Sequence, residues 1–111
     1  MRIISPSTIK EYSEQHPKAA GALTSWTTIV EGSTWKTPMD VKATINSVDT
    51  YVTEKLKRIL HIFNICGNDY RLICAIHFPK RDWQPGWVYV REFLTHKEYD
   101  RGTWKASNDK I

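Results

Sequence analysis

The chain has 111 residues, 41% of them hydrophobic and 25% charged, and its 16 basic and 12 acidic side chains give a net charge of +4. This length is enough for one hydrophobic core, so we expect a single domain over residues 1–111 and exclude two-domain and repeat architectures. The composition is that of a globular protein, which excludes disordered and fibrous classes.

The positive charge is unevenly distributed along the chain. Residues 1–53 carry five basic and five acidic side chains, whereas residues 54–105 carry ten basic and six acidic ones. The last six residues are neutral overall. Any basic surface that binds a polyanion is therefore expected in the second half of the chain.

The sequence shows no sign of membrane insertion, secretion or metal binding. No stretch approaches the roughly 18 apolar residues of a membrane span, and the first residues lack a signal-peptide core, so we expect a cytosolic protein. Cys66 and Cys74 are too few for a disulfide scaffold and lack the spacing and histidine partners of a zinc site. We expect buried free thiols, and neither a metal nor a cofactor.

The N-terminal part begins with a short strand at residues 3–4 and continues with two helices. Ser5 and Pro6 suit the N-cap and first position of a helix, which should end at Pro17. Apolar residues then recur at helical spacing from Ala19 to Val30, which predicts a second helix with one buried face. The two helices should form a hairpin that packs on a flat surface.

The pattern changes after a single helical turn at residues 37–43, which Thr37 and Asp40 begin as a capping box. Three runs rich in β-branched and aromatic residues follow, at 59–66, 69–78 and 87–94, and Gly67-Asn68 predicts a hairpin turn between the first two. This order predicts an α+β domain, with two N-terminal helices on an antiparallel-dominated sheet of about four strands and a short C-terminal helix.

The hairpin turn also predicts a register. With a two-residue loop, Asn64 faces Arg71 and Phe63 faces Leu72. In this register Cys66 and Cys74 lie on opposite faces of the sheet and cannot form a disulfide. Arg71 lies mid-strand on the less apolar face, which is costly unless this side chain is paired or binds something.

The densest polar cluster is the segment 91–101. His96 and Tyr99 share one face of a short helix if Thr95 caps it, and Arg91 precedes them on the strand, where parity directs it away from Glu92. Metal-free RNA cleavage needs a base for the 2′-hydroxyl, cations for the phosphorane and an acid for the leaving oxygen. The alternative is a purely structural helix cap, with Tyr99 as its hydrophobic anchor.

Two motifs resemble a known family. The run from Tyr89 to Asp100, YVREFLTHKEYD, and the run GNDYRL at 67–72 are similar to the HigB family of bacterial toxins, which are RelE-like mRNA interferases. The resemblance implies a RelE-type fold, endonucleolytic cleavage of mRNA, usually on the translating ribosome, and neutralisation by a HigA-like antitoxin with a helix-turn-helix domain.

The resemblance also assigns candidate residues. The positions that match functional residues of the family are expected to be catalytic, namely Arg71, Arg91, His96 and Tyr99. Basic side chains near the first hairpin strand and after the third strand are expected to hold RNA phosphates; these are Lys55, Lys57, Arg58, Lys97 and Arg101. We also expect Asp100 to pair with Arg91 or Arg101.

Some interpretations stay open. The connection 78–86 is longer and more aromatic than the family's usual turn, and forms either an RNA-stacking platform or, as we favour, a local cluster. The alternative to a nuclease is a non-catalytic RNA- or ribosome-binding domain of the same fold. A third class is a partner-binding module whose basic face docks an acidic protein.

Overall fold

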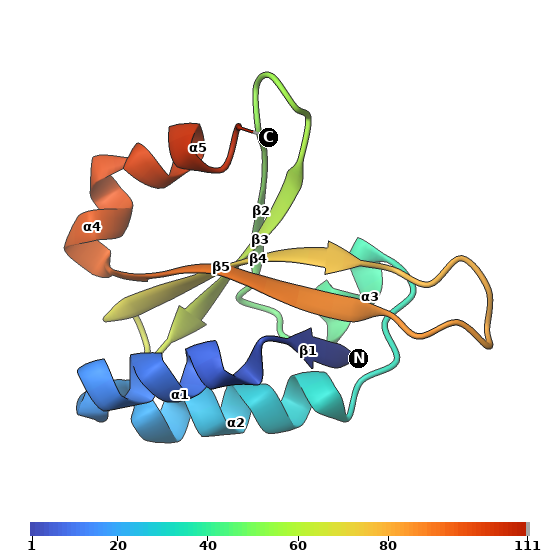
Figure 1. The fold of residues 1–111 in the computed structure, drawn as a ribbon, viewed down its shortest axis with the longest axis horizontal. Coiled ribbons are helices and arrows are strands. Elements are labelled where there is room, and N and C mark those ends of the chain that lie inside the picture. Colours follow the sequence, from blue (N-terminus) through green and yellow to red (C-terminus); the bar gives the residue numbers. More distant parts are fainter. Residues whose placement is uncertain (111) are drawn as a thin grey trace.

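The structure is a computed structural model that describes residues 1–110. The described residues form a mixed five-stranded sheet, in the order β1-β5-β4-β3-β2, with helices on both of its faces (Figure 1). In chain order the elements are β1 (Arg2–Ile4), α1 (Pro6–Gln15), the 3-10 turn η1 (Pro17–Ala19), α2 (Ala20–Glu31), α3 (Pro38–Thr44), β2 (Asp49–Val52), β3 (Ile59–Ile65), β4 (Tyr70–His77), β5 (Trp87–Thr95), α4 (His96–Arg101) and α5 (Thr103–Ser107).

The strand directions confirm the predicted α+β class. Strand β1 runs parallel to β5, and the other three pairings are antiparallel. The sheet has one strand more than expected across residues 1–110, because β2 pairs with β3 at the edge. This strand has four residues and begins with Asp49, which strands disfavour, so its sequence shows no clear pattern.

Helices α1 and α2 lie side by side on one face of the sheet, as the apolar spacing predicted (Figure 1). Leu23, Trp26 and Val30 of α2 are buried, and the Trp26 ring meets the Phe63 ring of β3 edge-on at 5.5 Å. Burying side chains of this size stabilises the fold by about 1.5–3 kcal/mol each. This packing anchors the helix pair on the sheet.

The two predicted helix starts differ in how they are capped. Pro6 opens α1 as expected, but Ser5 has a left-handed backbone with φ 60° and its side chain makes no capping hydrogen bond. In α3 the full capping box is present, because the Thr37 side chain accepts from the Asp40 amide and the Asp40 carboxylate accepts from the Thr37 amide. Ser5 is therefore the N-cap residue of α1 as predicted, but the prediction that its side chain caps the helix is wrong.

The predicted hairpin register is confirmed. Asn64 pairs with Arg71, and Phe63 pairs with Leu72. The turn itself occupies residues 66–69, and both Cys66 and Gly67 have positive φ. Since Cys66 lies in the turn instead of the strand, it packs against the core beneath α1 and α2 to which Cys74 also belongs, and the prediction of opposite faces is wrong. Both thiols are free as expected, but only Cys74 is buried, whereas Cys66 is partly exposed.

A β-bulge in β5 changes the direction of one predicted site residue. Ile73 pairs with Glu92, but the next residue of β4, Cys74, pairs with Val90, so Arg91 is the additional residue. A bulge breaks the strict alternation of side chains along a strand. Arg91 and Glu92 therefore both reach the same buried residue, Asn108, and the parity argument that separated them is wrong.

The C-terminal segment forms two short helices on the other face of the sheet (Figure 1). Gly102 separates them with φ 76°, a conformation that favours glycine. Trp104 of α5 is 3% exposed and packs on the sheet residues Leu60, Ile62 and Ile73, which holds the C-terminal segment against the sheet.

The sheet face beneath α1 and α2 contains one buried titratable ring. His61 of β3 is 1% exposed, pairs with Cys74 across the strands and lies edge-on to Phe78 at 6.0 Å. Neither ring nitrogen has a hydrogen-bond partner among the described residues. Burial lowers the pKa of His61 to about 4, so the ring is neutral near pH 7.

Candidate active site

The sequence-predicted residues lie on the sheet face that carries α4 and α5, but they form three separate groups. Arg71 lies against Tyr99, Arg58 and Arg91 meet at Asn108, and His96 pairs with Asp100. The first two groups both contact Trp104, through the Tyr99 ring and through Asn108.

The first group is a stack of a cation and two aromatic rings. The Arg71 guanidinium lies 5.2 Å from the centre of the Tyr99 ring, and that ring stacks on Trp104 at 5.2 Å with a 10° angle between the planes. Arg71 Nη1 also donates hydrogen bonds to the carbonyl oxygens of Asn68 and Tyr70, at 3.0 and 3.1 Å. The guanidinium is thus held in place by neutral partners.

The Tyr99 phenol is suited to donate a proton and poorly suited to accept one. Burial raises the pKa of Tyr99 above its usual value, the Asp49 carboxylate raises it further, and Arg71 opposes the change. The group therefore stays protonated at neutral pH. Between the roles of general base and general acid, the local environment therefore favours the acid.

The second group is organised by Asn108, a residue that the sequence did not single out. Its side chain is 2% exposed, and its Oδ1 accepts a hydrogen bond from Arg91 Nε at 3.1 Å. Its backbone oxygen accepts from Arg58 Nη1 at 3.0 Å, while its Nδ2 donates to Glu92 and to the Trp104 carbonyl oxygen. One buried residue near the chain end thereby holds an arginine of β5 and an arginine of the loop before β3.

A hollow of about 240 Å³ opens beside this residue, lined by Val90, Arg91, Glu92, Ser107 and Asn108. Arg91 is exposed there, since only its Nε is engaged by Asn108. The two terminal nitrogens of a guanidinium bind phosphate oxygens in a bidentate manner, and they remain accessible in this arrangement.

None of the three arginines Arg58, Arg71 and Arg91 forms an ion pair with a carboxylate within residues 1–110. Their partners are carbonyl and amide oxygens and an aromatic ring. Neutral partners position a cation without cancelling its charge. The face therefore keeps fixed positive charge available for an anion.

The third group lies farther along β5. The His96 Nδ1 is 2.9 Å from an oxygen of Asp100, and both side chains are more than half exposed. The expected pairing of Asp100 with Arg91 or Arg101 is therefore wrong. Because a strand rises about 3.3 Å per residue, the four-residue step from Arg91 to Thr95 spans about 13 Å, so His96 does not share a pocket with Arg91.

The predicted cap at the start of α4 is confirmed. The Thr95 side chain accepts from the Glu98 amide, and the Glu98 carboxylate accepts from the Thr95 amide at 2.9 Å. The hydrogen bond from the Thr95 amide lowers the pKa of Glu98 below its usual value. Lys97 and Arg101 are exposed on this short helix.

The basic loop before β3 is fixed by the residue that follows Asn108. The Asp109 carboxylate accepts hydrogen bonds from the backbone amides of Lys55 and Leu56, at 2.8–3.1 Å, and the Leu56 amide contributes most to lowering the pKa of Asp109. The Lys55 and Lys57 side chains are exposed, and Lys57 has φ 56°. The C-terminal residues thus position the loop as well as the arginines.

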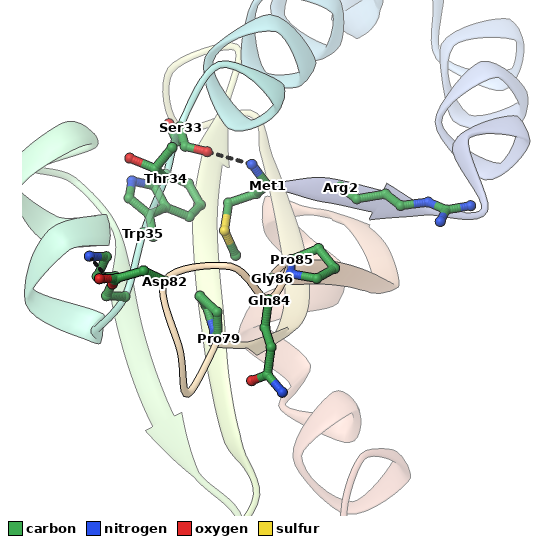
Figure 2. A pocket seen from close by; sticks show the side chains of 11 residues that line it. Met1, Arg2, Ser33, Thr34, Trp35, Pro79, Asp82, Gln84, Pro85 and Gly86 are labelled. Carbon is green, nitrogen blue, oxygen red and sulfur yellow. Dashed lines mark hydrogen bonds and ion pairs between the residues drawn. The ribbon is translucent and has the colours of Figure 1, made fainter.

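A larger hollow of about 340 Å³ lies elsewhere, between Met1, Trp35 and the connection 78–86 (Figure 2). Pro79 and Pro85 line it, and none of the predicted site residues does. Trp83 of the same connection is 76% exposed, so the favoured prediction of a local aromatic cluster is wrong for this residue.

Two further observations concern the described residues as a whole. In residues 1–110 no three His, Cys, Asp or Glu side chains are grouped so that they could hold a metal ion. None of the helices in that part of the chain has the length and apolar character to cross a membrane.

Comparison with known proteins shows which family the chain resembles. The family described as HigB toxin, RelE-like toxic component of a toxin-antitoxin system, matches residues 19–102. The mRNA interferase toxin HigB of Escherichia coli K12 is 28% identical over 100 residues, which cover 90% of this chain and 88% of the relative. The mRNA interferase HigB of Escherichia coli O6:H1 is 25% identical over 103 residues, covering 93% and 92%.

The match includes all three arginines, His96 and Tyr99, and it ends before Asn108. The residue that holds Arg58 and Arg91 thus lies outside the segment that identifies the family. The matched segment is more than half of the chain and contains both of the motifs singled out in the sequence. This chain belongs to the HigB toxin family, the RelE-like toxic components of toxin–antitoxin systems.

Proposed function

We propose that this chain is a metal-independent endoribonuclease that cleaves mRNA and thereby inhibits translation. The curated relatives named above are mRNA interferases. The observation that carries the proposal is the set of three arginines, Arg58, Arg71 and Arg91, on one face of the sheet, each held by neutral partners. Such cations stabilise the negative charge that develops on a phosphorane.

Arg71 is proposed to contact the scissile phosphate, and Arg91 a neighbouring phosphate of the same RNA strand. In the cleavage step the ribose 2′-hydroxyl loses a proton and attacks the adjacent phosphorus, and the 5′-oxygen leaves as it gains a proton. Tyr99, which stays protonated and touches Arg71, is the proposed acid or a stacking surface for a base. Both roles place it beside the bond that breaks.

His96 is the proposed proton acceptor. Asp100 contacts its Nδ1 at 2.9 Å, which favours a proton on that nitrogen and leaves Nε2 free to accept one. This role requires that the RNA extends from the arginines toward α4. Exposed Lys55, Lys57, Lys97 and Arg101 are proposed to bind backbone phosphates along that path.

The partners are proposed from the family. The toxin family implies an antitoxin, and we propose a HigA-like protein with a helix-turn-helix domain in that role. We further propose that cleavage takes place on the ribosome in the cytoplasm.

A cleavage assay tests the proposal. Purified protein is incubated with a reporter mRNA, with and without ribosomes, and new 5′ ends are mapped by primer extension. We expect new ends that disappear with Arg91→Ala and persist with Lys10→Ala, which removes an exposed cation from α1 on the opposite side of the sheet. Binding of RNA without new ends in either reaction would instead establish the non-catalytic RNA- or ribosome-binding domain.

The variant Tyr99→Phe separates the two roles of the ring, because it keeps the stack on Trp104 and removes the hydroxyl. If Tyr99 is the acid, cleavage falls while RNA affinity is unchanged. If cleavage is also unchanged, Tyr99 acts only through its ring.

A further inference from the structure

A second group of basic and aromatic side chains lies on the half of this sheet face that α4 and α5 leave open. Across the strands His77 of β4 pairs with Trp87 of β5, which pairs with Arg2 of β1. In the next row Tyr89 pairs with Ala75 on one side and Ile4 on the other. Neighbouring strands direct paired residues to the same face, so these six positions form two adjacent rows.

The alternation of β5 shows which face this is. Val88 and Val90 belong to the core beneath α1 and α2, so Trp87 and Tyr89 between them point to the opposite face. Arg91 lies two residues beyond Tyr89, about 7 Å along a strand, so the same alternation directs it to that face, and the bulge that follows leaves Glu92 there as well. The rows are therefore continuous with the proposed phosphate-binding arginines.

The rings on this face are arranged for stacking. His77 lies almost parallel to Trp87, with 4.6 Å between ring centres and a 14° angle between the planes. Tyr89 is 41% exposed, and His77 and Arg2 are also exposed. An aromatic surface left open to solvent on a soluble domain indicates a binding site.

The charges on this surface favour an anion. None of the six positions is acidic, and Arg2 and Arg91 border the rings on two sides. A surface for an acidic protein would also be basic, but it would not require parallel, exposed rings. Flat rings beside cations are what unpaired nucleobases and their phosphates bind.

We propose that Arg2, His77, Trp87 and Tyr89 form a stacking platform for unpaired bases of a single-stranded RNA. This inference rests on the proposed function and extends it, because it adds a base-binding subsite to the phosphate-binding arginines. Bases stack on the His77–Trp87 pair and on Tyr89, and Arg91 holds the phosphate between the platform and the Arg71–Tyr99 pair. Stacking of this kind does not discriminate strongly among bases.

The test compares two oligonucleotides that differ only in their bases. The first is a fluorescently labelled 2′-O-methyl hexamer of adenosine, which lacks the 2′-hydroxyl that cleavage requires. The second is its abasic counterpart with the same phosphates. Fluorescence anisotropy measures the affinity of each for the full chain and for the variants His77→Ala, Trp87→Leu and Tyr89→Ala.

We expect each variant to weaken binding of the adenosine hexamer roughly 10-fold, the size typical for losing one stacked base, and to leave the abasic hexamer unaffected. Tyr89→Phe keeps the ring and should bind like the unaltered chain. His77 and Tyr89 are exposed, so these variants report on the platform even if Trp87→Leu does not fold.

The control is Ile29→Ala, which removes a large exposed apolar side chain from α2 on the opposite side of the sheet. If it weakens binding of the adenosine hexamer as much as the platform variants do, the losses are not specific to this sheet face and the proposal is overturned. Equal losses for the adenosine and abasic hexamers also overturn it.

The experiments distinguish failure of the RNA platform from failure of the proposed function. If the chain cleaves mRNA but the platform variants keep full affinity for the adenosine hexamer, the platform is refuted and the proposed function stands. If the chain binds RNA through the platform but cleaves no mRNA, the proposed function is refuted and the platform stands. Platform variants that lose only antitoxin binding would assign the surface to the antitoxin and refute the RNA platform.

Discussion

One face of the sheet is covered by α1 and α2 over a large apolar core, whereas the opposite face is covered by α4 and α5 over a small one. The small core consists of Leu60, Ile62, Ile73 and Trp104. Around it lie the three arginines, and next to it the open aromatic rows.

The difference shows how a chain of 111 residues can combine a stabilising core and a binding surface on the two faces of one sheet. Apolar burial against two long helices supplies most of the stability on one side. On the other side, two helices of six and five residues cover only part of the sheet, which leaves room for cations and exposed rings. Substitutions on the two faces should therefore differ in kind: folding on one, RNA chemistry on the other.

The largest effect is expected from Arg71→Ala. It removes a guanidinium that no carboxylate neutralises within residues 1–110, so cleavage should fall roughly 100-fold or more, as is typical when one stabilising donor is lost. Growth arrest on expression should be relieved, and primer extension gives the rate. Thermal unfolding serves as the control, and a folded variant with undiminished toxicity would exclude Arg71 from the site.

Protonation of His61 would place a positive charge in the core beneath α1 and α2. The folded pKa is about 4 and the ordinary value is 6.5, so stability is complete above pH 6.5 and decreases as the pH falls toward 4. The loss should reach roughly 3 kcal/mol, because each pKa unit corresponds to about 1.4 kcal/mol. Urea unfolding between pH 7 and pH 4 measures it.

His61→Leu is the matched variant for that titration. It removes the titrating group from a site that contains no partner for its nitrogens among residues 1–110. The part of the pH dependence that belongs to this ring should disappear. If the unfolding free energies of the two proteins decline in parallel between pH 6.5 and pH 4, another group is responsible.

Asn108→Ala tests whether the C-terminal face is organised by this one residue. The change removes the acceptor of Arg91 and the donor to Glu92, and a buried polar group left unpaired costs about 1–3 kcal/mol. We expect a loss of stability of that size and about 10-fold slower cleavage, because Arg91 becomes mobile.

Ser107→Ala is the control for that change. Ser107 also donates to Glu92, but it contacts neither Arg58 nor Arg91 in the structure. Its cleavage rate should stay close to that of the unaltered chain. Equal cleavage rates for the Asn108→Ala and Ser107→Ala variants would show that Asn108 does not position Arg91 for cleavage.

The smallest effects are expected from a pair of glycines, one in each region. Gly102→Ala places a side chain at φ 76° between α4 and α5 and should destabilise the protein by about 1 kcal/mol. Gly21→Ala in α2 meets open space and should stabilise it by about 0.5–1 kcal/mol. Urea unfolding of both variants shows whether the opposite signs hold.

Much of the fold could be predicted because it depends on local patterns. Helical spacing predicted α2, the Thr37–Asp40 capping box predicted α3, Thr95 was the expected cap of α4, and the Gly67-Asn68 turn predicted which residues face each other in the β3–β4 hairpin. Strand β2 was missed because four residues carry too little pattern, and its pairing with β3 is what defines it.

The candidate site was predicted only as a set of residues. The motifs around Arg71 and at 89–100 indicated the family, and the comparisons confirmed that family membership. The spacing did not show that His96 pairs with Asp100 and lies along β5 from Arg91, or that Asn108 holds Arg58 and Arg91. An asparagine near the end of a chain carries no sequence signal for such a role.

The sequence by itself determined the fold class, the hairpin register, the family and the basic character of the second half, because capping, alternation, turn chemistry and charge are properties of neighbouring residues. Only the tertiary structure decided which cations lie together. A bulge at Arg91 breaks the alternation of β5, and the end of α5 places the buried Asn108 against Arg91 of β5 and Arg58 of the loop before β3. Both arise from contacts between distant parts of the chain, so the positions of the charges follow from the packing of α5 on the sheet.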